Sequence, residues 1–452
     1  MHQSTPCRSR PHATESLPSD RAKNRACLRP LLLLCCSLLL LRIMVALWLV
    51  PAWERTTNVS QFPDLYPQLA AGLLADHTLS FAGVSQTPTI VRGPGFPAYL
   101  ALGLLILSKP TWLRVWSVLP GILLAVGLGQ ALCRRFGRMV GISAAAIVGG
   151  HPLAVVVSAR VMSDEFVAFA SAAAIGVLFT ARRWEPSRLT LSVLLFNVAI
   201  LSRATAVLAL LATAIAAFRF DKDRTPTQRA LFTSLLVLFA LIGPAFWSIR
   251  SSRLAGTPVF VHSLAYYNIW MGIAHDRAGI GRSWQETWRA ERAILGRLAP
   301  DIMGADGTRG YATLSPLDTA TLERRLAAAL ARDLKRHPAQ HLLRGARGLL
   351  RFWWQAQTQG RTRQYFLAQA PLLVLTLVGL CTYFCRRQQH AAHPLLDAFA
   401  LWLLATNIAY AWTLPMARMS VQVLPATATF CALAGHHLLA GVSSAWRKRQ
   451  PH

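Results

Sequence analysis

Long apolar runs separated by short arginine clusters set the pattern of this chain. Most of the runs approach the length of about twenty residues that an α-helix needs to cross the hydrocarbon core of a bilayer. They fall at about 31–51, 114–133, 139–159, 165–181, 188–202, 204–218, 229–248, 366–385, 396–414 and 420–444. The pattern therefore predicts an all-α polytopic membrane protein, with a bundle of about ten transmembrane helices.

The arginine clusters indicate which loops face the cytoplasm, because Lys and Arg are enriched in short cytoplasmic loops. The clusters are Arg134, Arg135 and Arg138; Arg182, Arg183 and Arg188; Arg219 to Arg229; Arg386 and Arg387; and Arg447 to Arg449. If all of them lie inside, both termini are cytoplasmic and two large loops, 52–113 and 249–365, lie outside. Short outer turns are then expected near Ser163, Arg203 and Arg418.

This topology divides the chain into five regions. Residues 1–29 are polar and lack periodicity, which predicts a disordered basic cytoplasmic tail. The regions expected after it are an N-terminal transmembrane catalytic module at 30–248, the second outer loop at 249–365, C-terminal transmembrane helices at 366–445 and a cytoplasmic tail at 446–452. The first apolar run could also be a signal peptide, but its length favours a retained helix.

Both outer loops are expected to contain surface helices. The apolar stretch from Phe96 to Ser108 is too short to cross a bilayer, so we expect it to lie along or dip into the outer surface. Between Asp318 and Trp354, leucines recur at four-residue spacing until Pro338 breaks the pattern. This spacing predicts a helix at the membrane surface.

Composition supports lipid as the main surroundings of the chain. Hydrophobic residues make up 54% of the sequence and charged residues 15%, whereas soluble domains carry about 25% charged residues. The net charge of +28 attracts phosphate in nucleic acid or in lipid headgroups. Since the basic residues lie between apolar runs, membrane lipids are the expected partner and nucleic acid is not. All eight cysteines fall in the tail or in predicted helices, so we expect neither disulfides nor a zinc site.

The first outer loop carries a carboxylate and an arginine near the expected membrane surface. Asp64 and Tyr66 lie in its first part, and Arg92 precedes a stretch rich in glycine and proline. A carboxylate and an arginine at the boundary between water and lipid could hold the anionic head of a lipid-borne substrate. The alternative for Asp64 is a solvated loop residue or a helix N-cap.

Asp164 and Glu165 are paired acids where one predicted helix ends and the next begins. Such a pair could bind a cation, hold a sugar hydroxyl or accept a proton. It could instead stabilise the N-terminus of a helix, where negative charge is favourable. The spacing leaves both interpretations open.

Three arginines on the outer side are candidates for binding an anion. Arg203 interrupts an apolar stretch, and a charged residue at membrane depth usually faces a cavity or a partner because its burial in lipid is costly. Arg250 follows a predicted helix, and Arg418 lies between the last two. A guanidinium suits phosphate because its planar fork donates in pairs. For Arg250 the alternative is snorkelling into the headgroups.

Eight short motifs follow one another in the order found in one group of bacterial multi-pass enzymes. They are the segment around Tyr66 and Ala70; Arg92-Gly93-Pro94-Gly95-Phe96-Pro97; Arg134-Arg135-Phe136-Gly137-Arg138; Ser163-Asp164; Leu201-Ser202-Arg203-Ala204; Gly243 to Arg250; His337-Pro338 with Phe352-Trp353; and Ala417-Arg418-Met419 with Leu424-Pro425. The chain thereby resembles the GT-C superfamily of glycosyltransferases, in the branch of the protein mannosyltransferases, the aminoarabinose transferases and the RgtA/B/C/D-like group.

The resemblance implies a membrane glycosyltransferase with a GT-C-like helical bundle. Such an enzyme transfers a sugar from a polyprenyl-phosphate donor to a lipid or glycan acceptor of the cell envelope, with inversion at the anomeric carbon. The expected location is the bacterial inner membrane, with the reaction on its outer side.

The resemblance also implies roles for single residues. It makes Asp64 the catalytic base, with Asp164 supporting the site, and it places the donor phosphate near Arg203, Arg250 and Arg418. The remaining expected substrate-binding residues are Tyr66, Arg92 and Glu165. The outer loops contain no Asp-x-Asp pair, so no cofactor and no obligatory divalent ion is expected. The alternatives are a multi-pass transporter of an envelope precursor and an inactive scaffold of this fold.

Overall fold

The protein is built almost entirely of helices. The computed structural model describes residues 20–57, 64–180, 185–220, 225–304, 310–386 and 393–449. The α-helices are α1 (Asp20–Met44), α2 (Val50–Thr57), α3 (Tyr66–Ala75), α4 (Gly95–Leu107), α5 (Leu113–Phe136), α6 (Arg138–Gly150), α7 (Pro152–Ala159), α8 (Asp164–Phe179), α9 (Pro186–Ser202), α10 (Val207–Phe220), α11 (Pro226–Ala255), α12 (Ala265–Ala278), α13 (Trp284–Leu298), α14 (Pro300–Met303), α15 (Pro316–Arg336), α16 (Pro338–Trp354), α17 (Gln359–Arg386), α18 (Pro394–Trp412), α19 (Ala417–Ser420) and α20 (Leu424–Arg449). Shorter helical turns are Val45–Leu49, Pro110–Trp112, Ala204–Ala206, Tyr311–Thr313 and Val421–Val423.

The only sheet in the described residues is an antiparallel hairpin of two short strands. These are β1 (Ser80–Phe81) and β2 (Ser85–Pro88), between α3 and α4. The predicted all-α class is therefore confirmed.

Each predicted helical run is helical in the structure, but several helices are short for a full crossing. In the part of the chain that the structure describes, six spans have the length and apolar composition needed to cross a bilayer: Cys27–Thr56, Leu113–Phe136, Pro226–Ala255, Gln359–Cys385, Pro394–Trp412 and Ala417–Gly441. The number rises to seven if α6 and α7, which meet at a bend of 46°, form one span. The polytopic membrane fold is confirmed, and the number of about ten crossings stays a prediction.

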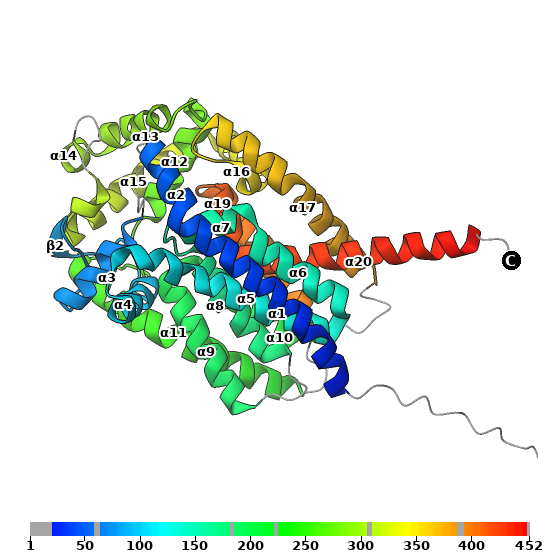
Figure 1. Ribbon diagram of the computed structural model, residues 1–452. Coiled ribbons are helices and arrows are strands. Elements are labelled where there is room, and N and C mark those ends of the chain that lie inside the picture. Colours follow the sequence, from blue (N-terminus) through cyan, green and yellow to red (C-terminus); the bar gives the residue numbers. More distant parts are fainter. Residues whose placement is uncertain are drawn as a thin grey trace, which may run out of the picture.

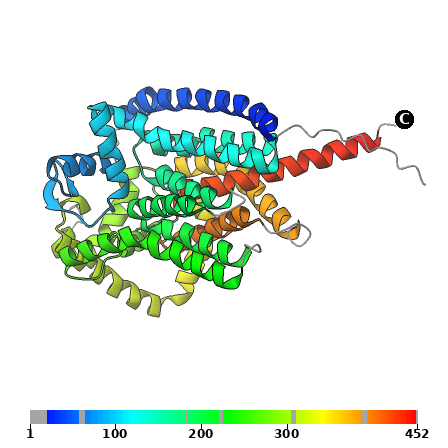
Figure 2. The ribbon, with the colours of Figure 1, turned by 90° about the horizontal axis from the view of Figure 1, so that it is seen from below.

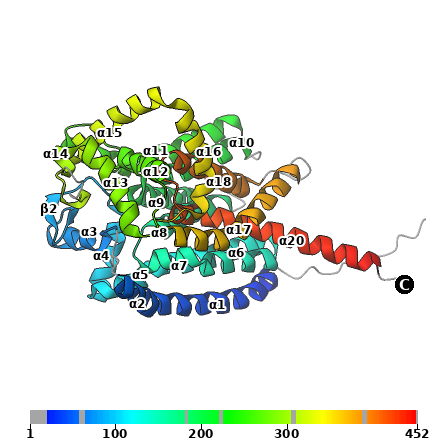
Figure 3. The ribbon, with the colours of Figure 1, turned by 90° about the horizontal axis from the view of Figure 1, so that it is seen from above.

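The long helices run side by side, and the predicted outer segments gather at one end of the bundle. Figures 1 and 2 show α3, α4, the hairpin and α12 to α15 at this end. The first turns of α1 and the last turns of α20 lie at the opposite end (Figures 1 and 3). The two described ends of the chain therefore share one side, as the predicted topology requires.

The two predicted surface-helix regions are helical. In α4, Phe96 and Leu100 are fully buried, whereas Leu105 and Ile106 are more than half exposed. One face of α4 packs against protein and the other is apolar and exposed, which suits a helix at the outer membrane surface. Pro338 begins α16 and separates it from α15, because proline fits the first turn of a helix but not its interior.

Several boundaries differ from the prediction because helices extend beyond their apolar centres. α1 begins at Asp20, inside the predicted tail of residues 1–29, where Arg, Ala, Lys and Leu favour a helix. α2 continues to Thr57, α11 continues to Ala255 and α17 begins at Gln359. The bounds 52–113 and 249–365 of the two outer loops stay a prediction.

The prediction that the cysteines form no disulfide is wrong. Cys27 in α1 is bonded to Cys133 in α5, and 106 positions separate them in the sequence. α1 and α5 pack against each other, a neighbourhood that the spacing of cysteines along the sequence does not reveal. The bond joins the two helices at the end of the bundle where the described chain begins.

Candidate active site

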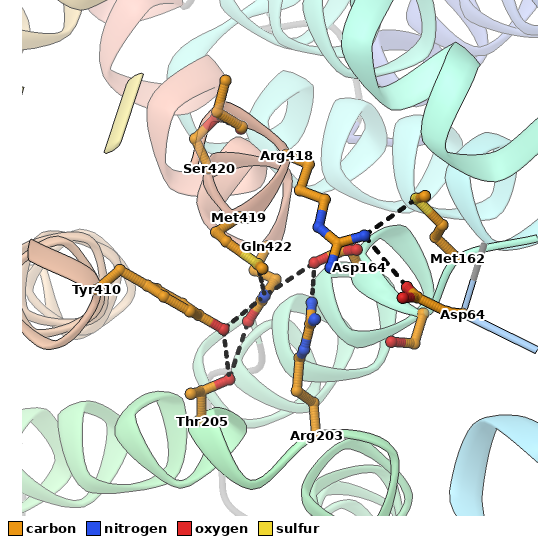
Figure 4. A network of polar contacts seen from close by, with 12 residues as sticks. Asp64, Met162, Asp164, Arg203, Thr205, Tyr410, Arg418, Met419, Ser420 and Gln422 are labelled. Atoms are coloured by element: carbon orange, nitrogen blue, oxygen red, sulfur yellow. Dashed lines mark hydrogen bonds and ion pairs between the residues drawn. The ribbon is translucent and has the colours of Figure 1, made fainter. Parts of the chain in front are cut away.

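Four short connections meet at one level of the bundle and carry the charged residues of the site. One is the turn before α3, which holds Asp64, and another is the link between α7 and α8, which ends at Asp164. The third is the break between α9 and α10 at Arg203, and the fourth leads from α18 into α19 with Arg418. Figure 4 shows these four side chains pointing toward one another.

Asp64 is a buried carboxylate held between two arginines. Its side chain lies 3.4 Å from Arg92 and 3.3 Å from Arg418, with one carboxylate oxygen for each guanidinium. Only 7% of the residue is exposed. Leu65 adopts a left-handed conformation, with φ of 56°, and turns the chain directly after Asp64 into α3. The carboxylate is thereby fixed against the start of a helix instead of standing free in a loop.

The surroundings of Asp64 keep it ionised. Burial alone would raise the pKa of this carboxyl, but the guanidiniums of Arg418, Arg92, Arg203 and Arg160 lower the pKa to about 2. Each cation stabilises the charged form of the acid. At neutral pH the side chain is therefore a carboxylate that can accept a proton.

Tyr66 and Arg92 connect the first outer segment to the rest of the site. The hydroxyl of Tyr66 lies 3.0 Å from that of Ser163. Arg92 donates to the hydroxyl of Tyr311 at 3.4 Å, and its guanidinium lies over the rings of Tyr66 and Tyr311 at 5.9 and 5.3 Å from their centres. Tyr311 belongs to the second outer segment, so both outer segments contribute to the wall around Asp64.

Asp164 is the centre of a second polar group. It is fully buried, pairs with Arg203 and accepts a hydrogen bond of 3.0 Å from the amide of Gln422. Gln422 also donates to the hydroxyl of Tyr410 at 2.9 Å and accepts from that of Thr205 at 3.0 Å (Figure 4). Residues from three parts of the chain thus fix the position of the Asp164 carboxylate.

Glycines bring two of the sequence motifs into direct contact. A side chain at Gly93 would overlap the carbonyl of Leu201, and one at Gly95 would meet the hydroxyl of Ser202. The start of α4 therefore packs directly on the end of α9. This close approach sets the spacing between Arg92 and Arg203, which adjoin the two contacts.

An open pocket lies beside Arg418, with about 550 Å³ of space that includes the solvent at its mouth. The residues that line it are Leu153, Val156, Val157, Arg160, Met162, Gln355, Ala356, Gln357, Arg361, Tyr365, Met416 and Arg418. None of these residues is acidic, and three carry guanidinium groups. The wall from α7 is largely apolar, so the pocket suits a ligand with an anionic head and an apolar tail.

Acidic and aromatic side chains of α2 pack against the arginines of this pocket. Arg160 lies 3.5 Å from Glu54, which also pairs with Arg114 at 2.6 Å. The ring of Trp53 lies under the guanidiniums of Arg160 and Arg361, at 5.3 and 4.5 Å from its centre. α2 thus helps to hold the arginines in place.

The structure brings together most of the predicted site residues, but not all. Asp64, Tyr66, Arg92, Asp164, Arg203 and Arg418 converge. Glu165 faces away from this group and pairs with Arg42, and Arg250 stacks on Trp247 at 4.2 Å from the centre of the ring. The physical reason for Glu165 is helical geometry, since successive residues of α8 point in different directions.

Residues that the sequence did not single out complete the site: Arg160, Thr205, Tyr311, Arg361, Tyr410 and Gln422. Within the described part of the chain, His, Cys, Asp and Glu side chains form no group of three or more that could hold a metal ion.

Comparison with known proteins gives one family match. Residues 91–247 match the family of dolichyl-phosphate-mannose-protein mannosyltransferases. This segment contains Arg92, Asp164 and Arg203. No curated protein sequence matches the chain.

The arrangement of helices is similar to that of a solved archaeal oligosaccharyltransferase. The oligosaccharyltransferase of Archaeoglobus fulgidus, in a complex with zinc and sulfate, is 14% identical, with a TM-score of 0.51 over 90% of this chain and 49% of that one. ArnT of Cupriavidus metallidurans bound to undecaprenyl phosphate is 14% identical, with a TM-score of 0.40 over 93% and 81% of the two chains. The chain spans about half the length of the archaeal protein.

Proposed function

We propose that the chain is a membrane glycosyltransferase of the GT-C superfamily, which the family match over residues 91–247 and the fold likeness to the archaeal oligosaccharyltransferase support. The proposed donor is a sugar on polyprenyl phosphate, and the proposed acceptor is a lipid or glycan of the cell envelope. Transfer takes place on the outer side of the bacterial inner membrane. In this proposal residues 30–248 form the catalytic module, and the C-terminal helices at 366–445 contribute Arg418.

One observation supports this proposal most directly. Arg418 contacts the buried carboxylate of Asp64 and also lines a pocket whose described walls contain three arginines and no acid. Arg418 therefore contacts the proposed base and also belongs to the proposed phosphate site. A sugar bound between them would have its anomeric carbon near the base and its phosphate on the arginines.

In the proposed step, the Asp64 carboxylate takes the proton of an acceptor hydroxyl, and the hydroxyl oxygen attacks the anomeric carbon. The bond from that carbon to the phosphate oxygen breaks, and the lipid phosphate leaves with the electron pair. A single displacement of this kind inverts the anomeric centre. The guanidiniums stabilise the charge that grows on the leaving phosphate.

Because Arg418 contacts Asp64, binding of the donor phosphate also changes the basicity of Asp64. A phosphate bound to Arg418 competes with Asp64 for the guanidinium. As that contact weakens, the pKa of Asp64 rises from its low value toward the ordinary range, and the carboxylate becomes a stronger base. The base is thus activated when the donor is present.

The other converging residues have supporting roles in the proposal. Tyr66 and Arg92 form the wall that faces the sugar and acceptor, and Asp164 holds Arg203 in its position near Asp64. Glu165 and Arg250 are not part of this substrate site, because their side chains contact other residues.

Reconstitution in liposomes tests the proposal. The wild-type protein, Asp64→Asn and Asp76→Asn are each supplied with a panel of polyprenyl-phosphate sugars and with envelope extracts as acceptors. Loss of a general base costs about 10²-fold to 10⁴-fold, so Asp64→Asn should reduce transfer by at least about a hundredfold. Asp76 is an exposed acid of the same outer segment, and Asp76→Asn should leave transfer near the wild-type rate.

Equal transfer by the wild type and Asp64→Asn would remove Asp64 as the base. Uptake of an envelope precursor coupled to an ion, with no transfer, would favour the transporter alternative. Absence of both activities over the whole panel would favour an inactive scaffold.

A further inference from the structure

A buried ion pair lies directly behind the candidate site. Arg42 of α1 is completely buried and donates to both carboxylate oxygens of Glu165, at 2.7 and 2.8 Å. Glu165 is the second residue of α8 and follows Asp164. Charged groups at membrane depth are costly, and those that occur usually have a function. The pair is therefore a candidate for a functional role.

Arg42 also donates hydrogen bonds to backbone carbonyls that are left free where α6 ends. Pro152 has no backbone N–H, so the carbonyl of Val148 lacks its donor four residues ahead. The guanidinium of Arg42 donates to this carbonyl at 2.9 Å and to that of Gly149 at 2.7 Å. One side chain thus joins α1, the end of α6 and the start of α8.

The first turn of α8 is held from two sides. Asp164 faces the candidate site, where it contacts Arg203 and Gln422. Glu165 faces the opposite way, toward Arg42. A shift of Glu165 would move the neighbouring Asp164, and with it the arginine that Asp164 holds.

We propose that Arg42 and Glu165 are positioning residues that fix Asp164 and Arg203 in the active site. The proposal rests on the proposed glycosyl transfer. Both oxygens of Glu165 are occupied by Arg42, and only 1% of the residue is exposed. Glu165 therefore acts through the backbone of α8 and does not touch the substrate.

A glycine on a neighbouring helix allows a test that leaves every charge in place. At Gly121 of α5, an added methyl group would overlap the carboxylate of Glu165 and the guanidinium of Arg42. At Gly127 of the same helix, an added methyl group would meet nothing within 4 Å. Gly121→Ala and Gly127→Ala are thus a matched pair in which only the first disturbs the ion pair.

The experiment compares these two variants in the full-length reconstituted protein. A small misplacement of catalytic groups costs up to about a hundredfold, so Gly121→Ala should lower kcat by about tenfold to a hundredfold. Gly127→Ala should keep the wild-type kcat. In an Asp164→Asn background, Gly121→Ala should have less than about a twofold effect, because the group that it displaces is already disabled.

Hydrogen exchange of the peptide around residues 160–170 provides a readout that needs no activity. Exchange should be faster in Gly121→Ala than in Gly127→Ala, because the first turn of α8 loosens. Unchanged exchange, or an equal loss of kcat with and without Asp164, would overturn the positioning role. Absence of transfer by the wild type would instead contradict the proposed function, and the exchange comparison would still decide the role of the pair.

Discussion

At the scale of single residues, the basicity of Asp64 depends on how many guanidiniums share its two oxygens. Arg92 and Arg418 each contact one oxygen, and both lower the pKa of the buried carboxyl. A base with a low pKa is always ionised but accepts protons weakly. Asp64 therefore becomes a stronger base only when one of the two arginines binds another anion.

Replacing one of these arginines should move the pH dependence of transfer in a defined direction. The catalytic base must be ionised, so activity falls as the pH drops through the pKa of Asp64. In the wild type this pKa is about 2, and Asp64 should impose no acid limb on kcat/KM above pH of about 4. In Arg418→Gln the pKa rises, so the residual kcat/KM should decline already at higher pH.

Profiles of kcat/KM against pH check this expectation. Arg361→Gln is the matched control, because Arg361 lines the same pocket but lies outside the cations that lower the pKa of Asp64. It should weaken donor binding without moving the acid limb. An acid limb that moves equally in both variants would contradict the conclusion that Arg418, but not Arg361, lowers the pKa of Asp64.

The sequence points to most charged residues of the site, though not to Arg160 or Arg361, and to Tyr66 among the neutral ones. Asp64, Arg203 and Arg418 stand out because each interrupts apolar or loop sequence. Tyr311 and Gln422 do not stand out, because tyrosine and glutamine are common in loops and helices alike and only the fold shows that they reach the site. The sequence predicts that Glu165 contacts the substrate together with its neighbour Asp164, but adjacent residues of a helix face different directions.

At the scale of elements, the contact between α4 and α9 depends on two residues without side chains. Gly93 and Gly95 let the start of α4 touch the backbone at the end of α9. Inserting a methyl group into a packed contact costs about 1 to 3 kcal/mol. We expect Gly95→Ala to destabilise the protein by that amount and to lower transfer, since Arg92 and Arg203 adjoin this contact.

Thermal unfolding in detergent measures this effect. Gly176→Ala in α8 is the control, because an added methyl group there would meet nothing within 4 Å. It should be neutral or stabilising by up to about 1 kcal/mol, as expected for removal of glycine from a helix. Equal unfolding temperatures for the two variants would show that the α4–α9 contact tolerates a side chain.

Apolar periodicity predicted where helices lie, but not how they bend or pair. The sequence predicts one span over residues 139–159. In the structure this segment is bent by 46° between α6 and α7. The pair His151-Pro152 marks the bend, but a proline in a membrane helix often leaves it continuous because neighbours satisfy the freed carbonyls. Here the neighbour is Arg42, which lies more than a hundred residues earlier in the sequence.

At the scale of the whole molecule, the lengths of the short helices predict that the site lies near one edge of the bilayer. α9 has 17 residues, and a helix of that length spans about 26 Å of the roughly 30 Å hydrocarbon core. α9 ends and α10 begins around Arg203, so we expect the site to lie slightly inside the membrane boundary. At that depth the proposed lipid-linked donor would keep its tail in hydrocarbon while its phosphate contacts the arginines.

The fold makes a definite prediction about membrane sides. The described ends of the chain lie at one end of the bundle, and α12 to α15 lie at the other (Figure 1). A protease site inserted at Gly279, between α12 and α13, should be cut by protease added outside intact spheroplasts. A site inserted at Gly137, between α5 and α6, should be protected, as should a tag at the C-terminus, because the arginines flanking Gly137 favour the cytoplasm. Cleavage at Gly137 with protection at Gly279 would put Asp64 on the cytoplasmic side, where the proposed transfer to an outer acceptor cannot take place.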